Sequence, residues 1–208
     1  MSQFALPLVS RGKDDPARIV LGAGNSHVAE ALREPGRWPF GTAVLVGPPR
    51  SGKSLLARWF ANAGSGAAID GADALDETEL FHRWNRAQES GEPLLLVAGS
   101  PSWQITLPDL RSRVGAALHL EIGTPGDDLV GGLIESHAVQ RGLALGEGAL
   151  TYLVPRAERS YAGIERLVAA IDRLTLERKA PPTLSIWRDA LEAVRGPEQG
   201  KLDLGHGN

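Results

Sequence analysis

Eight consecutive residues carry the clearest chemical signal in the chain. The run Gly47-Pro-Pro-Arg-Ser-Gly-Lys-Ser54 has the spacing G-x-x-x-x-G-K-S, whose glycines let backbone amides turn inward toward a phosphate chain. The lysine is spaced to reach the outer phosphate oxygens, and the final serine to ligate magnesium. We therefore predict a site for ADP, ATP or another purine nucleotide, lined by Pro48, Pro49, Arg50, Ser51, Gly52, Lys53, Ser54 and Leu55.

Carboxylates that can complete a magnesium site follow a short apolar run. Asp70 ends the run that begins at Ala67, and we expect it to share Mg²⁺ with Ser54. Gly71 comes next, where an active ATPase of this kind normally carries a second acid to orient water, so slow self-hydrolysis is expected. Three nearby acids could take the role of the second acid: Asp73, Asp76 and Glu77. Acids before a helix, however, more often cap it or lie in its solvated first turn.

Two later features are also candidates for nucleotide chemistry. Ser100 follows an apolar run at residues 94–98, where a polar side chain can sense the γ-phosphate, and a plain turn serine explains it equally well. Arg111 and Arg113 precede another apolar run and belong near the edge of a sheet. Such a pair is usually solvated, yet an arginine there can be offered to a neighbouring subunit's nucleotide as an arginine finger.

The elements that must position these groups alternate along the chain. Apolar runs at residues 42–46, 67–70, 94–98 and 118–122 indicate buried strands, whereas residues 25–32, 55–62 and 76–90 have helical spacing. This alternation predicts a three-layer α/β P-loop core with a parallel sheet. After Pro125 only helices are expected, at residues 126–141, 146–158, 161–178 and 185–194, and these predict a small all-helical lid.

Composition limits the remaining function classes. The chain has 208 residues, a formal charge of −3 and no cysteine, which excludes disulfides and thiolate sites. The sequence contains no basic run that would indicate an extended nucleic-acid surface, so any DNA contact is expected to be weak or indirect. No apolar stretch is long enough for a membrane span, and the five histidines lack zinc-site spacing. We expect a cytoplasmic protein.

The same patterns divide the chain into segments. We expect a flexible tail at residues 1–18, a P-loop core at 19–124, a helical lid at 125–195 and a disordered end at 196–208. The apolar residues Ile19, Val20 and Leu21 at the start of the core are candidates for an adenine slot.

Taken together, four segments resemble the DnaA-related branch of the AAA+ proteins, and within it the Hda-type regulatory inactivators of DnaA. They are the hexamer QFALPL at residues 3–8, the P-loop, LFHRWN at residues 80–85 and LPDLRSR at residues 107–113. The resemblance covers nearly the whole chain. It implies an AAA+ fold and a role in limiting the initiation of replication.

The resemblance also implies partners. The hexamer looks like the family's motif for binding the DNA polymerase sliding clamp as an extended peptide, and a disordered tail is the simpler interpretation. The corresponding clamp-binding residues are Gln3, Phe4, Leu6, Pro7 and Leu8. Position within LPDLRSR implies that Arg113, rather than Arg111, is the arginine finger acting in trans on DnaA-bound ATP.

The sequence departs from this family in two places. Few residues separate the P-loop helix from Asp70, so the usual second strand is either deleted or is itself residues 67–70. The family has an arginine that touches the nucleotide at the start of the third lid helix. When this sequence is aligned with that pattern, Glu165 occupies the arginine position. Arg159 and Arg166 lie nearby in the sequence.

These observations predict a regulator that holds ADP or ATP with magnesium, has weak or no ATPase of its own, docks on the sliding clamp and promotes hydrolysis of DnaA-bound ATP. The alternative is a self-sufficient P-loop ATPase or small-molecule kinase, against which Gly71 argues. A recruiter of another replication or repair protein is a third hypothesis. Whether the chain forms a homodimer is left open.

Overall fold

A four-stranded parallel sheet lies at the centre of the computed structural model, which describes residues 19–99 and 103–195. The strand order is β2-β3-β1-β4, and every neighbouring pair is parallel. The strands are β1 at Thr42–Val46, β2 at Ala67–Asp70, β3 at Leu94–Val97 and β4 at Leu118–Glu121. This confirms the predicted parallel α/β core, with β3 and β4 each one residue shorter than expected.

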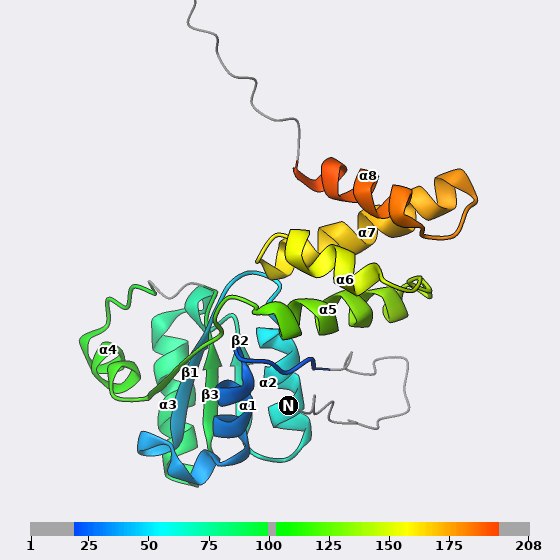
Figure 1. Cartoon of the computed structure of the whole chain (residues 1–208). Helices are drawn as coiled ribbons and strands as arrows, with labels where there is room; N and C mark the ends of the chain where they lie inside the picture. Colours follow the sequence, from blue (N-terminus) through cyan, green and yellow to red (C-terminus); the bar gives the residue numbers. More distant parts are fainter. Residues whose placement is uncertain (1–18, 100–102, 196–208) are drawn as a thin grey trace, which may run out of the picture.

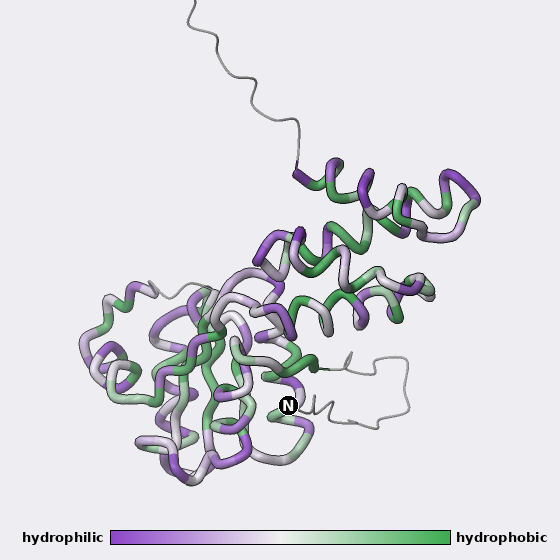
Figure 2. Tube along the Cα trace, viewed as in Figure 1, coloured by the Kyte–Doolittle hydropathy of each residue, from purple (hydrophilic) through white to green (hydrophobic). Residues whose placement is uncertain are grey.

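Helices cover both faces of the sheet and complete three layers (Figure 1). They are α1 at Ser26–Arg33 and α2 at Lys53–Asn62 on one face, and α3 at Glu77–Ser90 and α4 at Pro108–Gly115 on the other. Successive strand residues point to opposite faces. Leu45 therefore packs against α1 and α2, whereas Val44 packs against α3 and α4. The two inner strands, β1 and β3, are accordingly apolar along nearly their whole length, and hydrophobic segments lie at the centre of the sheet layers in Figure 2.

The sequence pattern does not predict α4. Proline occupies its first turn, and only Leu110 and Val114 are buried from this eight-residue helix. Two apolar residues are too few to reveal a helical period. Short 3-10 turns also connect the main elements, at Pro35–Arg37, Pro39–Gly41, Ala72–Ala74 and Val154–Arg156.

Helices α5 to α8, which we call the lid, stack beside one another outside these three layers (Figure 1). They are α5 at Asp127–Gln140, α6 at Ala149–Leu153, α7 at Tyr161–Arg178 and α8 at Leu184–Arg195. Their shared core includes Ile134, Leu167 and Ile171. Helix α6 is shorter than predicted because Gly148 precedes it with φ of 78° and the proline of the following 3-10 turn cannot continue an α-helix. No helix in the described ranges is long and apolar enough to cross a membrane.

Tyr161 joins the lid to the sheet layers. It opens α7, yet its ring is buried in the cluster beneath α1 and α2, together with Leu129 of α5. Its hydroxyl donates a hydrogen bond of 3.1 Å to the carbonyl of Gly123, in the connection between β4 and α5. Burial raises the pKa of Tyr161 to about 12. This contact fixes the first turn of α7 against the end of the sheet.

We predict that Tyr161→Phe lowers the free energy of unfolding by about 1 kcal/mol at neutral pH, because the Gly123 carbonyl loses its donor. The pKa of Tyr161 is raised in the folded protein. The contribution of its hydroxyl to the free energy of unfolding is therefore complete below the ordinary tyrosine pKa of about 10 and is lost as pH rises through about 12. Denaturant unfolding at neutral and alkaline pH measures both effects.

The matched control is Tyr152→Phe, which removes a hydroxyl from a half-buried lid tyrosine whose ring lies near that of Trp187. Equal stability losses in the two variants, or none in either, would contradict the assigned hydrogen bond.

Candidate nucleotide-binding site

The segment between β1 and α2, residues 47–54, forms a tight turn that we call the phosphate loop. A Cβ added at Gly47 would lie 2.8 Å from the Cβ of Ile122, closer than real side chains approach. Gly52 ends the turn with φ of 87°, in the left-handed region that glycine adopts most readily. Both glycines of the motif are therefore required by backbone geometry, and the turn delivers the chain directly into α2.

Lys53 places its cation back across the loop. Its Nζ donates hydrogen bonds to the carbonyls of Gly47 at 2.7 Å and Pro48 at 3.0 Å. Partial burial lowers the pKa of Lys53, and the carboxylates of Asp70 and Asp73 act in the opposite direction. The residue also opens α2, whose amino end carries the positive end of the helix dipole. A cation, a helix amino terminus and two acids thus meet at one edge of the sheet.

The two serines of the phosphate loop have different surroundings. Ser51 is buried, and its Oγ has no hydrogen-bond partner among the described residues. A buried hydroxyl left without a partner costs about 1–3 kcal/mol, which a phosphate oxygen accepting its proton would offset. Ser54 is exposed in the first turn of α2. These hydroxyls fit a phosphate and a magnesium ion, respectively.

Asp70 and Asp73 lie at the end of the sheet where the phosphate loop turns. Asp70 is paired with Val97 of β3, and Val97 is paired with Leu45 of β1, so one strand separates Asp70 from the strand that feeds the loop. Asp73 accepts a hydrogen bond of 2.9 Å from the backbone of Gly99. Carboxylate oxygens suit Mg²⁺. No cluster of three or more acidic or histidine side chains in the described ranges could hold a metal alone, so magnesium here would also need phosphate oxygens and water.

The residue after Asp70 has a left-handed backbone conformation. Gly71 has φ of 70° and ψ of 36°, so any side chain there would be strained. Among the three possible substitutes, Asp76 caps α3 by accepting from the amides of Thr78 and Glu79. Glu77 is engaged by the segment before α4. Of these three substitutes, Asp73 is the one whose carboxylate raises the pKa of Lys53.

The start of the described chain lies beside the lid connection. Asn25 is buried, accepts a hydrogen bond of 2.9 Å from the amide of Gly22 and donates one of 2.8 Å to the carbonyl of Val20. Ile19 and Val20 are half-buried against the cluster that contains Tyr161. The predicted adenine residues therefore lie next to the contact between α7 and the sheet layers. Ser100 and the predicted clamp-binding hexamer fall outside the described residues.

The lid presents an acid to the phosphate loop. Glu165 of α7 forms an ion pair with Arg50, with 3.5 Å between Oε2 and Nε. The two arginines near it in the sequence have other partners, because Arg159 pairs with Asp127 and Arg166 with Glu158. Of the predicted lid residues, Glu165 alone joins the loop through a charged contact in the described structure.

Arg113 is held against α3. Its guanidinium carbon lies 4.3 Å from the ring centre of Trp84 and 4.8 Å from that of Phe81, and its Nη1 donates a hydrogen bond of 2.9 Å to Asn85. The predicted finger is thus half-buried and held by two aromatic rings and one amide oxygen. Arg111 is exposed on the same helix.

A carboxylate fixes the helix that carries Arg113. Glu77 in the first turn of α3 accepts hydrogen bonds from the amide and hydroxyl of Thr106, both at 2.8 Å, and from the amide of Leu107 at 2.6 Å. These bonds lower the pKa of Glu77. Residues 80–85 belong to the segments that resemble the DnaA-related proteins, but their contact with Arg113 was not predicted. The available signal was the helical spacing of residues 81, 84 and 85, which puts two aromatic rings and an amide on one face.

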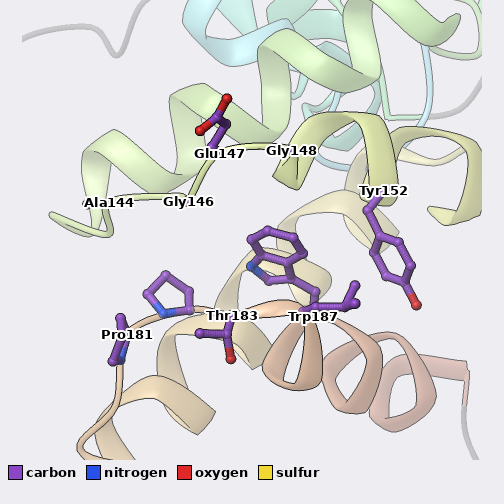
Figure 3. A pocket seen from close by; sticks show the side chains of 10 residues that line it. Ala144, Gly146, Glu147, Gly148, Tyr152, Pro181, Thr183 and Trp187 are labelled. Carbon is purple, nitrogen blue, oxygen red and sulfur yellow. The ribbon is translucent and has the colours of Figure 1, made fainter.

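The lid contains a hollow of about 560 Å³ between the loop after α5 and the start of α8 (Figure 3). Its walls are mostly apolar, and they include Tyr152, Pro182, Leu184 and Trp187, with Glu147 as the charged residue. None of the lining residues belongs to the phosphate loop. Because a polyphosphate needs cationic and amide donors, we assign the candidate nucleotide site to the phosphate loop and not to this hollow.

Comparison of the sequence with known proteins finds little. No family model matches the chain. An uncharacterized protein of Haemophilus influenzae is 29% identical over 121 residues, which cover 56% of this chain and 52% of that protein. The matched region thus spans about half the length of that relative.

Solved structures are similar over most of the chain. Domain III of the replication initiation protein DnaA from Thermotoga maritima has a TM-score of 0.69 at 16% identity, covering 85% of this chain and 95% of that chain. The RuvB Holliday junction branch migration motor from the same organism has a TM-score of 0.58 at 17% identity, with coverages of 83% and 70%. A DnaA bound to AMPPCP and single-stranded DNA has a TM-score of 0.56 at 16% identity, with coverages of 76% and 65%.

These likenesses show the fold: the chain has a P-loop AAA+ fold of the kind seen in DnaA. The narrower Hda-type assignment stays a prediction.

We predict that Lys53→Ala weakens binding of both Mg-ADP and Mg-ATP by about thirtyfold or more, because a charge-assisted bond to phosphate is lost. Calorimetric titration of the purified chain measures the change. The control is Arg58→Ala, which removes an exposed cation from the same helix. Unchanged affinity in the Lys53 variant would place the phosphates elsewhere.

Proposed function

We propose that this protein is a nucleotide-binding regulator of replication initiation. In this proposal it binds ADP or ATP at the phosphate loop, docks on the DNA polymerase sliding clamp, and promotes hydrolysis of ATP held by DnaA. The observation that carries the proposal is the convergence of Lys53, the amino end of α2, Asp70 and Asp73 at one sheet edge. The similarity of the fold to DnaA domain III supports the choice of partner, since AAA+ modules of like shape can pack side by side.

Each group at the loop has a defined task in this proposal. The loop amides and Lys53 bind the outer phosphates, and the buried hydroxyl of Ser51 donates to a phosphate oxygen. Ser54 and Asp70 hold magnesium, which neutralises phosphate charge when bound. Ile19 and Val20 contact the purine ring. The first turn of α7 closes the site from the lid side.

Weak self-hydrolysis follows from the surroundings of Asp70. Gly71 cannot be replaced by an acid without backbone strain, and Asp76 and Glu77 are already engaged in holding α3 and α4. The alternative, a self-sufficient ATPase or kinase, depends on Asp73 orienting the attacking water, because its carboxylate lies near Lys53. The amide of Gly99 already occupies one oxygen of that carboxylate. We therefore favour the regulator.

Arg113 has the contacts expected of a finger kept in place until a partner arrives. Two aromatic rings and Asn85 orient the guanidinium without neutralising its charge. A phosphate forms stronger, charge-assisted hydrogen bonds with arginine than an amide oxygen does. The phosphates of a neighbouring nucleotide can therefore draw Arg113 away from Asn85.

We predict that Arg113→Ala lowers stimulated hydrolysis of DnaA-bound ATP by about a thousandfold, while affinity for Mg-ADP is retained, because the finger acts on the partner's nucleotide. Release of phosphate from DnaA preloaded with labelled ATP, in the presence of clamp on DNA, is the readout. The control is Arg111→Ala on the same helix.

Full stimulation by the Arg113 variant would remove the finger from the mechanism. Loss of its own nucleotide affinity would instead mean that the arginine acts in cis. Turnover of about 1 s⁻¹ or more by the purified wild-type chain alone would favour the enzyme hypothesis.

We also predict that replacing Gln3, Leu6 and Leu8 by alanine weakens binding to the sliding clamp at least about tenfold, since the motif would lose its polar and apolar anchors. Surface plasmon resonance with immobilised clamp measures this. The control replaces Lys13, Asp14 and Asp15 in the same segment. Equal clamp binding by both variants would exclude the hexamer as the docking motif.

A further inference from the structure

The hollow in the lid is not used by the proposed nucleotide site. Its volume of about 560 Å³ lies within the range of about 300–1,000 Å³ that is usual for binding sites. The rings of Tyr152 and Trp187, with centroids 6.2 Å apart, line one side, and Pro181 and Pro182 line the other (Figure 3). A surface of this composition suits an apolar occupant.

The indole N–H of Trp187 needs a hydrogen-bond acceptor. The residue is 6% exposed, and its Nε1 is buried without a partner among the described residues. Figure 3 shows this nitrogen on the side of the ring that faces Pro181. An indole N–H can only donate, and a buried donor without an acceptor is destabilising. An occupant with a carbonyl group would satisfy it.

The charge at the hollow is also unmatched. Glu147 is exposed in the loop after α5, and it forms no ion pair within the described ranges. No lysine or arginine lines the hollow. An occupant that carries a cation next to its apolar part would complement this carboxylate.

One segment of the chain has this chemistry. Residues 3–8, QFALPL, are mostly apolar and contain Pro7, and Arg11 and Lys13 follow them before the first acid, Asp14. A proline has a fixed φ and favours an extended backbone at the residue before it. Aromatic-lined grooves bind extended, proline-containing peptides because little entropy is lost on binding.

The distance along the lid is within reach of this segment. Gly22 lies against Leu129 in the first turn of α5, since a Cβ added at Gly22 would meet the Cβ of Leu129 at 2.8 Å. From Leu129 to Gln140 the helix rises about 17 Å, and the hollow begins in the loop that follows. The ten residues 9–18, which join the hexamer to the described chain, can span up to about 33 Å.

The other end of the chain fits less well. Residues 196–208 follow the end of α8 at Arg195, whereas the hollow lies at the start of that helix. Pro197 comes two residues after α8 and cannot reach back along its length of about 18 Å. This segment has no other proline and no phenylalanine, tyrosine or tryptophan.

We propose that the lid hollow binds residues 3–8 of the same chain. A backbone carbonyl of the hexamer accepts the hydrogen bond from Trp187, and Arg11 or Lys13 lies beside Glu147. The linker is short, so the local concentration of the hexamer is high and a weak contact is sufficient. Under the proposed function the same six residues bind the clamp, so the lid and the clamp compete for them. The docking on the lid does not depend on the nucleotide site.

A spin label next to the hexamer tests this contact. The chain has no cysteine, so Ser2→Cys introduces the only thiol and carries a nitroxide at a single position. Nuclear magnetic resonance of the isotope-labelled full chain then follows the indole N–H signal of Trp187, which is assigned by its loss in Trp187→Phe. Docking predicts that this signal is lost beside the nitroxide and returns when the label is reduced. The indole signal of Trp84, on the opposite face of the sheet, is expected to remain.

Filling the hollow supplies the matched variant. A Cβ added at Gly146 would lie 3.5 Å from the Pro182 oxygen and from Cζ2 of Trp187, which is ordinary van der Waals contact. Gly146→Leu therefore occupies the hollow, and it is expected to restore the Trp187 signal in the spin-labelled chain. The control is Gly36→Leu, because nothing lies within 4 Å of a Cβ added there. Its Trp187 signal is expected to be lost as in the chain with Gly146.

A Trp187 signal that persists beside the nitroxide, or that is lost equally in Gly146→Leu, would overturn the inference. A mixture in which the nitroxide and the isotope label are carried by different copies gives a further check. Equal loss of the signal in that mixture would assign the hollow to the hexamer of a second copy and not to the same chain. Neither result would affect the proposed nucleotide site, which is tested by calorimetry.

Discussion

The close approach of Gly47 to Ile122 sets the geometry on which the candidate site depends. Strand β1 runs between β3 and β4, so the chain leaving it must turn in the narrow space beside the end of β4. A residue without a side chain permits that turn, and Gly52 then starts α2 from a left-handed conformation. Lys53 is consequently carried back over the loop carbonyls. Asp70 at the end of β2 and Asp73 in the following 3-10 turn lie at the same end of the sheet as this turn.

Local signals in the sequence predict much of the core. The strands are short apolar runs bounded by turns, and the glycine spacing of residues 47–54 is a backbone requirement that can be recognised without the fold. Helix α7 has the predicted bounds because its long apolar stripe is regular. Helix α4 cannot be predicted in the same way, because only Leu110 and Val114 contact the core. The length of α6 depends on the glycine before it and the proline after it, and the periodicity alone does not show where these residues end the helix.

Contacts between segments that are far apart in the sequence could not be predicted. Arg50 and Glu165 were both predicted near the nucleotide, yet their pairing depends on how α7 packs against the sheet through Tyr161. Arg113 was identified from its motif, whereas its contacts with Trp84 and Asn85 follow from α4 lying over α3. No local pattern encodes such distances.

Hydrogen exchange of the purified full chain, with and without saturating Mg-ADP, tests the central claim most directly. Binding at the phosphate loop predicts slower exchange at residues 47–55, at residues 19–25 beside them, and in the first turn of α7. The hollow around Trp187 should be unaffected. Unchanged exchange at the phosphate loop, or protection confined to the lid hollow, would contradict the assignment of the site.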